Sequence, residues 1–111
     1  MTERKRLSNR RKGLRVTIGS GTSAVTLSTG EYETVHPDLG HGSLGEIFLD
    51  APKEGSFTRD ILNAFAMAVS LGLQHGVGLE TFTHTFRNFT MEPDLIRQVF
   101  RELEAHYQER A

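Results

Sequence analysis

One stretch constrains the fold more than any other: residues 56–75, the most apolar segment of the chain. Apolar side chains recur there at the three- and four-residue spacing of a helix face. They are Ile61, Leu62, Phe65, Val69 and Leu73, with Met67 and Leu71 widening the stripe and Ala64, Ala66 and Ala68 between them. A helix that is apolar over more than half its circumference needs cover, so we expect the rest of the chain to pack around it.

Both ends of this helix are marked in the sequence. Ser56 or Thr58 is expected to cap the first backbone N–H groups, and Asp60 suits the positive end of the helix dipole. Gly76 is placed for a left-handed stop after the last periodic residue. Gly72 costs about 1 kcal/mol relative to alanine inside a helix, which close packing of a neighbour would explain.

Length and composition narrow the class of protein. A chain of 111 residues is long enough for one domain. It contains no cysteine, which excludes disulfides, thiolate metal sites and thiyl-radical chemistry within this sequence. No apolar run reaches the roughly 18–20 residues of a membrane span, and residues 1–15 lack the apolar core of a signal peptide. We therefore expect a cytoplasmic protein with no membrane association.

The first thirteen residues are basic. Their charged members are Arg4, Lys5, Arg6, Arg10, Arg11 and Lys12, after Glu3. Arms of this kind can bind phosphates, which leaves a nucleic-acid binder as one hypothesis. No aromatic residue is interleaved for base stacking, so we expect a solvated, partly disordered terminus and regard nucleic acid as an unlikely partner. The predicted division is a basic arm, 1–13, and one α+β domain, 14–111.

The remaining pattern predicts a small sheet followed by helices. Alternating segments at 14–18 and 24–29 flank a turn, and a third strand is expected at 44–50. The helices are expected at 56–75, 79–87 and 93–109. We therefore predict an α+β fold, in which a small antiparallel three-stranded sheet precedes three helices and the central helix packs on the sheet.

A sheet this small has open edges and one face to spare. Phe48 and Tyr32 are candidates for an apolar patch on that face. This predicts a homo-oligomer, a dimer or higher, with a two-fold dimer as the commonest solution.

No catalytic or metal constellation is visible. His36, Asp38 and His41 share the loop 34–43 but lack regular ligand spacing and a fourth ligand, so we expect no metal and no cofactor. The five histidines are scattered, and the carboxylates fall on predicted exposed faces or in turns. Acid–base catalysis needs paired groups in one pocket, so we do not expect an enzyme.

Binding of a nucleotide-like anion is the better-supported chemistry. The start of the central helix offers free N–H groups after Lys53, and Arg59 sits in its first turn. Arg97 and Arg101, early in the last helix, can close a charged pocket. The alternatives are that Arg59 is solvated and that Arg97 pairs within its own helix.

Aromatic residues gather after the second helix. Phe82, Phe86 and Phe89 can stack a base, and Asn88 can read its edge. The alternative is that these phenylalanines belong to the core.

Several blocks, in order along the chain, carry a family resemblance. They read LSNRR at 7–11, STGEYE at 28–33, LGEIFLD at 44–50, KEG at 53–55, NAFAMAVSLGLQHGV at 63–77, FTMEP at 89–93 and FREL at 100–103. This order resembles the C-terminal region of adenosylcobalamin-dependent (class II) ribonucleotide reductases, over nearly the whole chain. The resemblance implies a shared module.

Departures from the family argue against a shared reaction. The reductases carry their radical chemistry in a large barrel upstream of this region, and this sequence contains neither that barrel nor a cysteine. The loop at 34–43 is longer than expected, the segment after Pro93 is shortened, and the terminal cysteine-rich tail is missing.

The resemblance implies two functions of different class. Small stand-alone proteins similar to this module occur in phages, where anti-Thoeris oligomers sequester cyclic nucleotide signals between subunits. A sponge for cyclic ADP-ribose isomers or cyclic oligonucleotides, in the host cytoplasm, is therefore the leading hypothesis. The alternative is an accessory subunit or stand-alone C-terminal domain of a class II ribonucleotide reductase.

Overall fold

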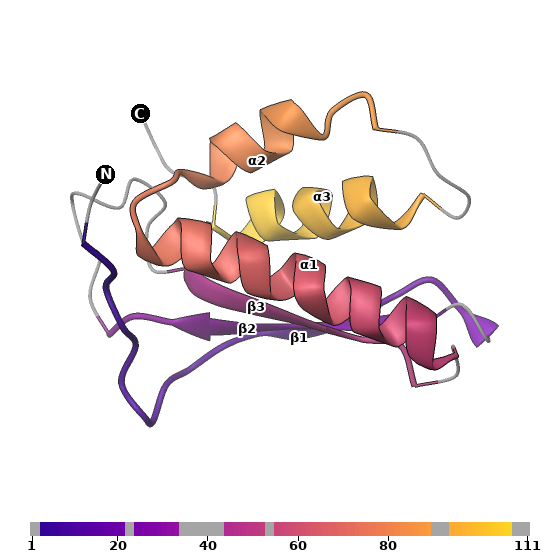
Figure 1. Ribbon diagram of the computed structural model, residues 1–111, viewed down its shortest axis with the longest axis horizontal. Helices are drawn as coiled ribbons and strands as arrows, with labels where there is room; N and C mark the ends of the chain where they lie inside the picture. The colour runs from indigo at the N-terminus through magenta and orange to yellow at the C-terminus, as the bar shows by residue number, and fades with distance from the viewer. Residues whose placement is uncertain (1–2, 22–23, 34–43, 53–54, 90–93, 108–111) are drawn as a thin grey trace.

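The computed structural model describes residues 3–21, 24–33, 44–52, 55–89 and 94–107, and it is an α+β fold (Figure 1). Three strands, β1 (Arg15–Ile18), β2 (Val25–Glu31) and β3 (Leu44–Asp50), precede three helices. The helices are α1 (Ser56–Gln74), α2 (Leu79–Thr85) and α3 (Leu95–Tyr107). The predicted fold class is confirmed, β3 has the predicted bounds, and β1, β2, α1 and α2 differ from prediction by a residue or two. The predicted ends of the last helix, 93 and 109, lie outside the described residues.

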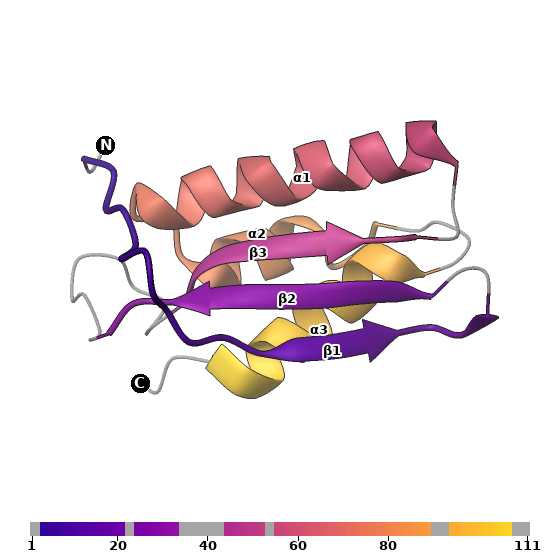
Figure 2. The same ribbon diagram turned by 90° about the horizontal axis from the view of Figure 1, so that it is seen from below.

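The sheet is antiparallel in the order β1-β2-β3, and its two faces differ in polarity. Paired residues such as Val16 with Leu27, and Leu27 with Leu49, place one apolar side chain after another on the same face. Figure 2 shows α2 and α3 behind the sheet, covering one face. The buried stripe of α3, from Ile96 to Tyr107, joins that core as predicted.

Helix α1 covers the β3 edge of the sheet. Its buried side chains, Leu62, Ala66, Val69 and Leu73, face β3 and the core. Ser70 Oγ accepts from the Ile47 N–H at 2.8 Å and donates to the Ile47 carbonyl at 3.1 Å, while Gln74 Nε2 donates to the Gly45 carbonyl at 3.0 Å. Side chains one helical turn apart thus occupy backbone groups that an edge strand otherwise leaves open to other chains.

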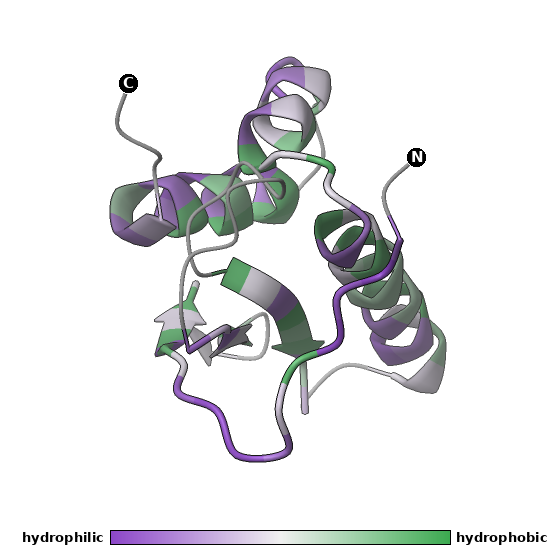
Figure 3. Ribbon diagram, turned by 90° about the vertical axis from the view of Figure 1, so that its left-hand side faces the viewer, coloured by the Kyte–Doolittle hydropathy of each residue, from purple (hydrophilic) through white to green (hydrophobic). Residues whose placement is uncertain are grey.

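The prediction that the chain surrounds α1 is wrong. Phe57 is 78% exposed, Ile61 54%, Met67 63% and Leu71 42%. The reason is visible end-on in Figure 3, where α1 stands on one side of the core and α2 with α3 on the other. The two later helices cover the sheet, so only one side of α1 is buried.

The N-terminal end of α1 differs from the prediction, and its C-terminal end agrees with it. Gly55 occupies the N-cap position with no side-chain cap, because Ser56 is already helical, and Asp60 lies beyond the first turn. Gly76 has a φ of 95°, as the predicted stop requires. A Cβ on Gly72 would lie 2.7 Å from the Phe82 ring, which confirms close packing as the reason for that glycine.

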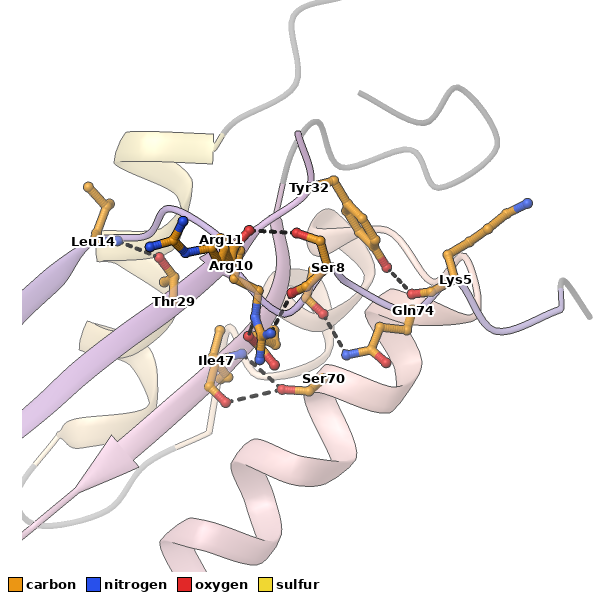
Figure 4. Close-up of polar contacts among 12 residues, drawn as sticks. Lys5, Ser8, Arg10, Arg11, Leu14, Thr29, Tyr32, Ile47, Ser70 and Gln74 are labelled. Carbon is orange, nitrogen blue, oxygen red and sulfur yellow. Dashed lines mark hydrogen bonds and ion pairs between the residues drawn. The ribbon is translucent and has the colours of Figure 1, made fainter. Parts of the chain in front are cut away.

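The basic N-terminal arm is largely exposed, as expected, but contacts of Arg4, Lys5 and Arg11 hold it to the fold (Figure 4). Arg4 Nε donates to Gln74 Oε1 at 2.7 Å, and the Lys5 N–H donates to the Gln74 carbonyl at 2.7 Å. Arg11 forms an ion pair with Glu46, whose carboxylate lies where a Cβ on Gly30 would stand. The arm is therefore held to α1 and β3 by contacts far apart in sequence.

The predicted apolar patch on the sheet is half right. Phe48 is 47% exposed on the outer face of β3, as expected. Tyr32 is 6% exposed and its hydroxyl donates to the Lys5 carbonyl, so it belongs to the interior. Among the described helices, none combines the length and the apolar character that crossing a bilayer requires.

Candidate functional site

A groove between α2 and α3 gathers several of the predicted site residues. Its volume is about 190 Å³. The lining consists of Thr83, Phe86, Arg87, Arg97, Phe100, Arg101 and Glu104, and we call this set the α2–α3 groove. The two helices are antiparallel neighbours in Figure 1, so residues from the end of α2 and just beyond it meet residues along α3.

The apolar wall of the α2–α3 groove is a stack of phenylalanines. Phe86 and Phe100 are nearly parallel, with ring centroids 5.6 Å apart and an interplanar angle of 6°. Phe82 stacks on Phe100 at 6.2 Å, and Phe65 meets Phe100 edge-on at 6.1 Å. Both geometries are favourable for aromatic pairs. Phe100 is 2% exposed, so the stack belongs to the hydrophobic core. Two of its rings, Phe86 and Phe100, also line the groove.

Arginines supply the charge. Arg97 and Arg101 are four residues apart on α3 and so project from one side of it. The Arg97 guanidinium has a carboxylate at 3.8 Å, that of Asp94, and is 39% exposed. Within the described residues, the guanidinium groups of Arg87 and Arg101 form no hydrogen bond or ion pair. Against these cations the lining carries one acid, Glu104. The groove therefore favours an anion next to an aromatic surface.

The structure brings some predicted ligand-binding residues together and separates others. Arg97 and Arg101 line the groove, as expected for a charged pocket. Phe82 packs beneath it against Gly72 and Phe100, which matches the alternative that it is a core residue. Arg59 and Asn88 are exposed and do not line it, and Lys53 lies outside the described residues. Binding itself stays a prediction for all of them.

Sequence reasoning missed four lining residues, Thr83, Arg87, Phe100 and Glu104. Of these, Arg87 is the residue that the sequence pattern could have indicated, because it directly precedes Asn88, which the pattern did single out. Glu104 lies three residues after Arg101 on the same helix.

A second hollow, of about 680 Å³, lies over the basic arm. It is lined by Arg10, Arg11, Lys12, Glu31, Tyr32 and Glu33. Two glutamates offset its cations, and Arg11 is already paired with Glu46. This hollow is less suited to a phosphate than the α2–α3 groove.

A buried polar cluster ties α3 to the sheet. The Tyr107 hydroxyl donates to Glu31 and lies 2.8 Å from Thr29 Oγ1, which in turn accepts from the Leu14 N–H at 2.7 Å. Burial, and then the hydrogen bond to Glu31, raises the pKa of the Tyr107 phenol far above its ordinary value. The phenol therefore stays neutral, and the cluster acts as a structural tie.

No metal centre is found in the part of the chain that the structure describes, where no three His, Asp or Glu side chains converge. His36, Asp38 and His41, at which the sequence analysis expected no metal, lie outside the described residues.

Comparison with known proteins places this fold in a family. Vitamin B12-dependent ribonucleotide reductases of Bradyrhizobium diazoefficiens and Agrobacterium fabrum are each 39% identical in sequence to this chain, over 99% and 95% of its length. That of Streptomyces clavuligerus is 40% identical over 81%. The chain spans only about 9% of the length of these relatives. No solved structure matches it. The TSCPD domain model matches residues 3–107, and the chain belongs to the TSCPD domain family.

Proposed function

We propose that this chain is a non-catalytic accessory domain of a vitamin B12-dependent ribonucleotide reductase, acting by contact with a catalytic chain. One observation carries the proposal. Nearly all of this chain matches a stretch that makes up about 9% of the Bradyrhizobium and Agrobacterium reductases, so the match is to one domain-sized part of a much larger protein.

The residues present support a role without chemistry of its own. The sequence holds no cysteine for a thiyl radical. The α2–α3 groove contains a single carboxylate, Glu104, and no histidine, so it offers no acid–base pair. What it does offer is charge and an aromatic surface, which suits holding a substrate or effector nucleotide near a catalytic chain.

A complementation experiment tests this proposal. The reductase of Bradyrhizobium diazoefficiens is prepared without its matched stretch, and this chain is added in trans. We expect a complex by size-exclusion chromatography with light scattering, and an increase in ribonucleotide turnover. The intact reductase, which keeps its own stretch, is the control and should bind less of the added chain. Absence of both a complex and a turnover change, with both proteins folded by circular dichroism, would contradict the proposal.

A second candidate function is the sequestration of a nucleotide signal without cleavage, as in the phage sponge proteins. The specific observation in its favour is the set of three arginines beside stacked phenylalanine rings. At about 190 Å³ the groove is below the roughly 300–1,000 Å³ of typical ligand pockets. It therefore suits the phosphate end of a nucleotide, with the rest of the ligand lying outside it.

Calorimetry tests which nucleotide binds and which arginine contributes to the binding free energy. ADP, cyclic ADP-ribose and a cyclic dinucleotide are titrated into the wild-type chain and into Arg101→Ala. We expect at least one ligand to bind, and Arg101→Ala to lose about 1.5–3 kcal/mol of binding free energy. Arg59→Ala, an exposed arginine outside the groove, is the matched control. A loss with Arg59→Ala and none with Arg101→Ala would move the site to the start of α1, and no heat with any ligand would remove this candidate.

A further inference from the structure

The exposed side of α1 carries an apolar stripe with regular spacing. Its members are Phe57, Ile61, Ala64, Ala68 and Leu71, all exposed, and we call them the outer stripe. Their separations of four, three, four and three residues are those of the a and d positions of a heptad repeat, which face a partner helix in paired helices.

The outer stripe has no partner among the described residues. The opposite side of α1 is already buried against β3 and the core through Leu62, Ala66, Val69 and Leu73. The helix holds only two charged residues, Arg59 and Asp60, both near its start. A helix that is apolar on both sides is normally covered on both. Contiguous apolar surface of this kind marks an interaction site more often than scattered single residues do.

We infer that the outer stripe is where a second copy of this chain packs, with the two α1 helices antiparallel about a two-fold axis. The spacing of the stripe, continued to His75, reads the same from either end. Side-chain size is also symmetric, because the large residues lie toward both ends and Ala64 and Ala68 lie in the middle. A two-fold contact requires a surface that is complementary to itself.

The antiparallel arrangement assigns each contact. Ile61 faces Leu71 of the partner subunit, and Ala64 faces Ala68 of the partner subunit. The alanines at the axis allow the helices to approach within the 8–10 Å typical of packed helix pairs. Parallel packing would instead set each member of the outer stripe against its own equivalent, so that Ala64 faces Ala64 of the partner subunit.

The size of the outer stripe sets the strength of the dimer. A helix of 19 residues is about 28 Å long and about 10 Å wide. This strip is smaller than the roughly 800 Å² that each partner buries in a standard interface. We therefore expect a weak dimer that dissociates at micromolar concentration. The inference goes beyond the proposed function and does not depend on it.

Light scattering across concentration tests the contact, beginning from the monomer mass of 12.4 kDa. The wild type is expected to approach twice that mass at high concentration. Ala64→Glu places a charge at the axis and should keep the chain monomeric at least tenfold higher in concentration. Asn63→Glu, exposed on α1 but off the stripe, is the matched control and should dimerise normally. A wild type that stays monomeric throughout, or an Ala64→Glu variant that dimerises normally, overturns the inference.

Cross-linking tests the direction of the helices, because the chain has no cysteine of its own. Ala64→Cys and Ala68→Cys variants are prepared separately, mixed and oxidised. The antiparallel contact predicts disulfides mainly between unlike variants. Disulfides mainly between like variants would indicate parallel packing and overturn the assignment. If Ala64→Glu instead disrupts only a complex with a reductase chain, the occupant is that chain and the inference fails.

Discussion

Arginines at two places in this molecule are used in opposite ways. At the N-terminal arm, Arg4 is hydrogen-bonded to the side chain of Gln74, and Arg11 is paired with the buried Glu46. In the α2–α3 groove, Arg87 and Arg101 have no such contacts within the described residues, and Arg97 has only the distant Asp94 carboxylate. The first set is committed to the fold, while the second is available to a ligand.

The difference shows why a count of basic residues is a poor guide to a binding site. The arm is the most basic stretch of the sequence, yet the guanidinium groups of Arg4 and Arg11 satisfy buried acceptors in α1 and β3. The groove contains fewer cations, but they line it together with stacked aromatic rings, and the guanidinium groups of Arg87 and Arg101 keep their donors free within the described residues. A charge-assisted hydrogen bond can stabilise either a fold or a ligand, and the neighbours decide which.

The strongest perturbation removes the support of the groove. Phe100→Ala deletes a ring that is 2% exposed and contacts Phe65, Phe82 and Phe86. We expect the free energy of unfolding to fall by about 3–5 kcal/mol in urea denaturation. Phe89→Ala, whose ring is 45% exposed, should cost far less and serves as the control. Equal losses would show that the stack is not part of the core.

The next perturbation releases the arm. Gln74→Ala removes the acceptor of Arg4 and the donor to the Gly45 carbonyl, in a side chain that is 3% exposed. We expect a loss of about 2–3 kcal/mol in unfolding free energy, because a buried carbonyl is left without a donor. Trypsin should also cleave the arm faster than in the wild type, with the exposed Asn63→Ala as control. An unchanged cleavage rate would mean that Gln74 does not hold the arm.

A smaller effect is expected at the tie between α3 and the sheet. Tyr107→Phe loses the hydrogen bonds to Glu31 and Thr29, which we expect to cost about 1–2 kcal/mol at neutral pH. Because the pKa of the folded phenol is raised, the unfolded chain ionises first as pH passes about 10. This contribution to stability is complete below that pH and is lost above it.

The measurement is the unfolding free energy of both proteins between about pH 8 and pH 11. In this range the wild type should lose up to about 1.4 kcal/mol per pH unit more than Tyr107→Phe once the pH exceeds about 10. The variant provides its own control, since every other titrating group is shared. Parallel curves would contradict the pKa direction assigned to Tyr107.

Features of the fold that depend on residues close together in sequence could be predicted, whereas features that depend on contacts between distant residues could not. The bounds of β3, the buried stripe of α3 and the stop at Gly76 follow from local periodicity and backbone preference. That Arg97 and Arg101 project from the same side of α3 follows from their four-residue spacing. The participation of Arg87 does not, because it depends on how α2 packs against α3.

Two predictions failed for a related reason. Contacts of the arm join residues 70 and 35 positions apart, Arg4 to Gln74 and Arg11 to Glu46, which no local pattern reveals. The prediction that the rest of the chain packs around α1 failed because the sequence of a largely apolar helix does not show which of its sides will be buried. Its outer stripe became informative only once the inner side was seen against β3.

The contrast between the two sets of arginines is best tested by two variants measured in the same two assays. Arg11→Ala leaves Glu46 unpaired and should lose about 1.5–3 kcal/mol of unfolding free energy while keeping its affinity for ADP. Arg97→Ala with Arg101→Ala should bind ADP at least tenfold more weakly while its stability changes by less than about 0.5 kcal/mol. The reverse result, with binding lost at Arg11 and stability lost at the groove, would contradict the account.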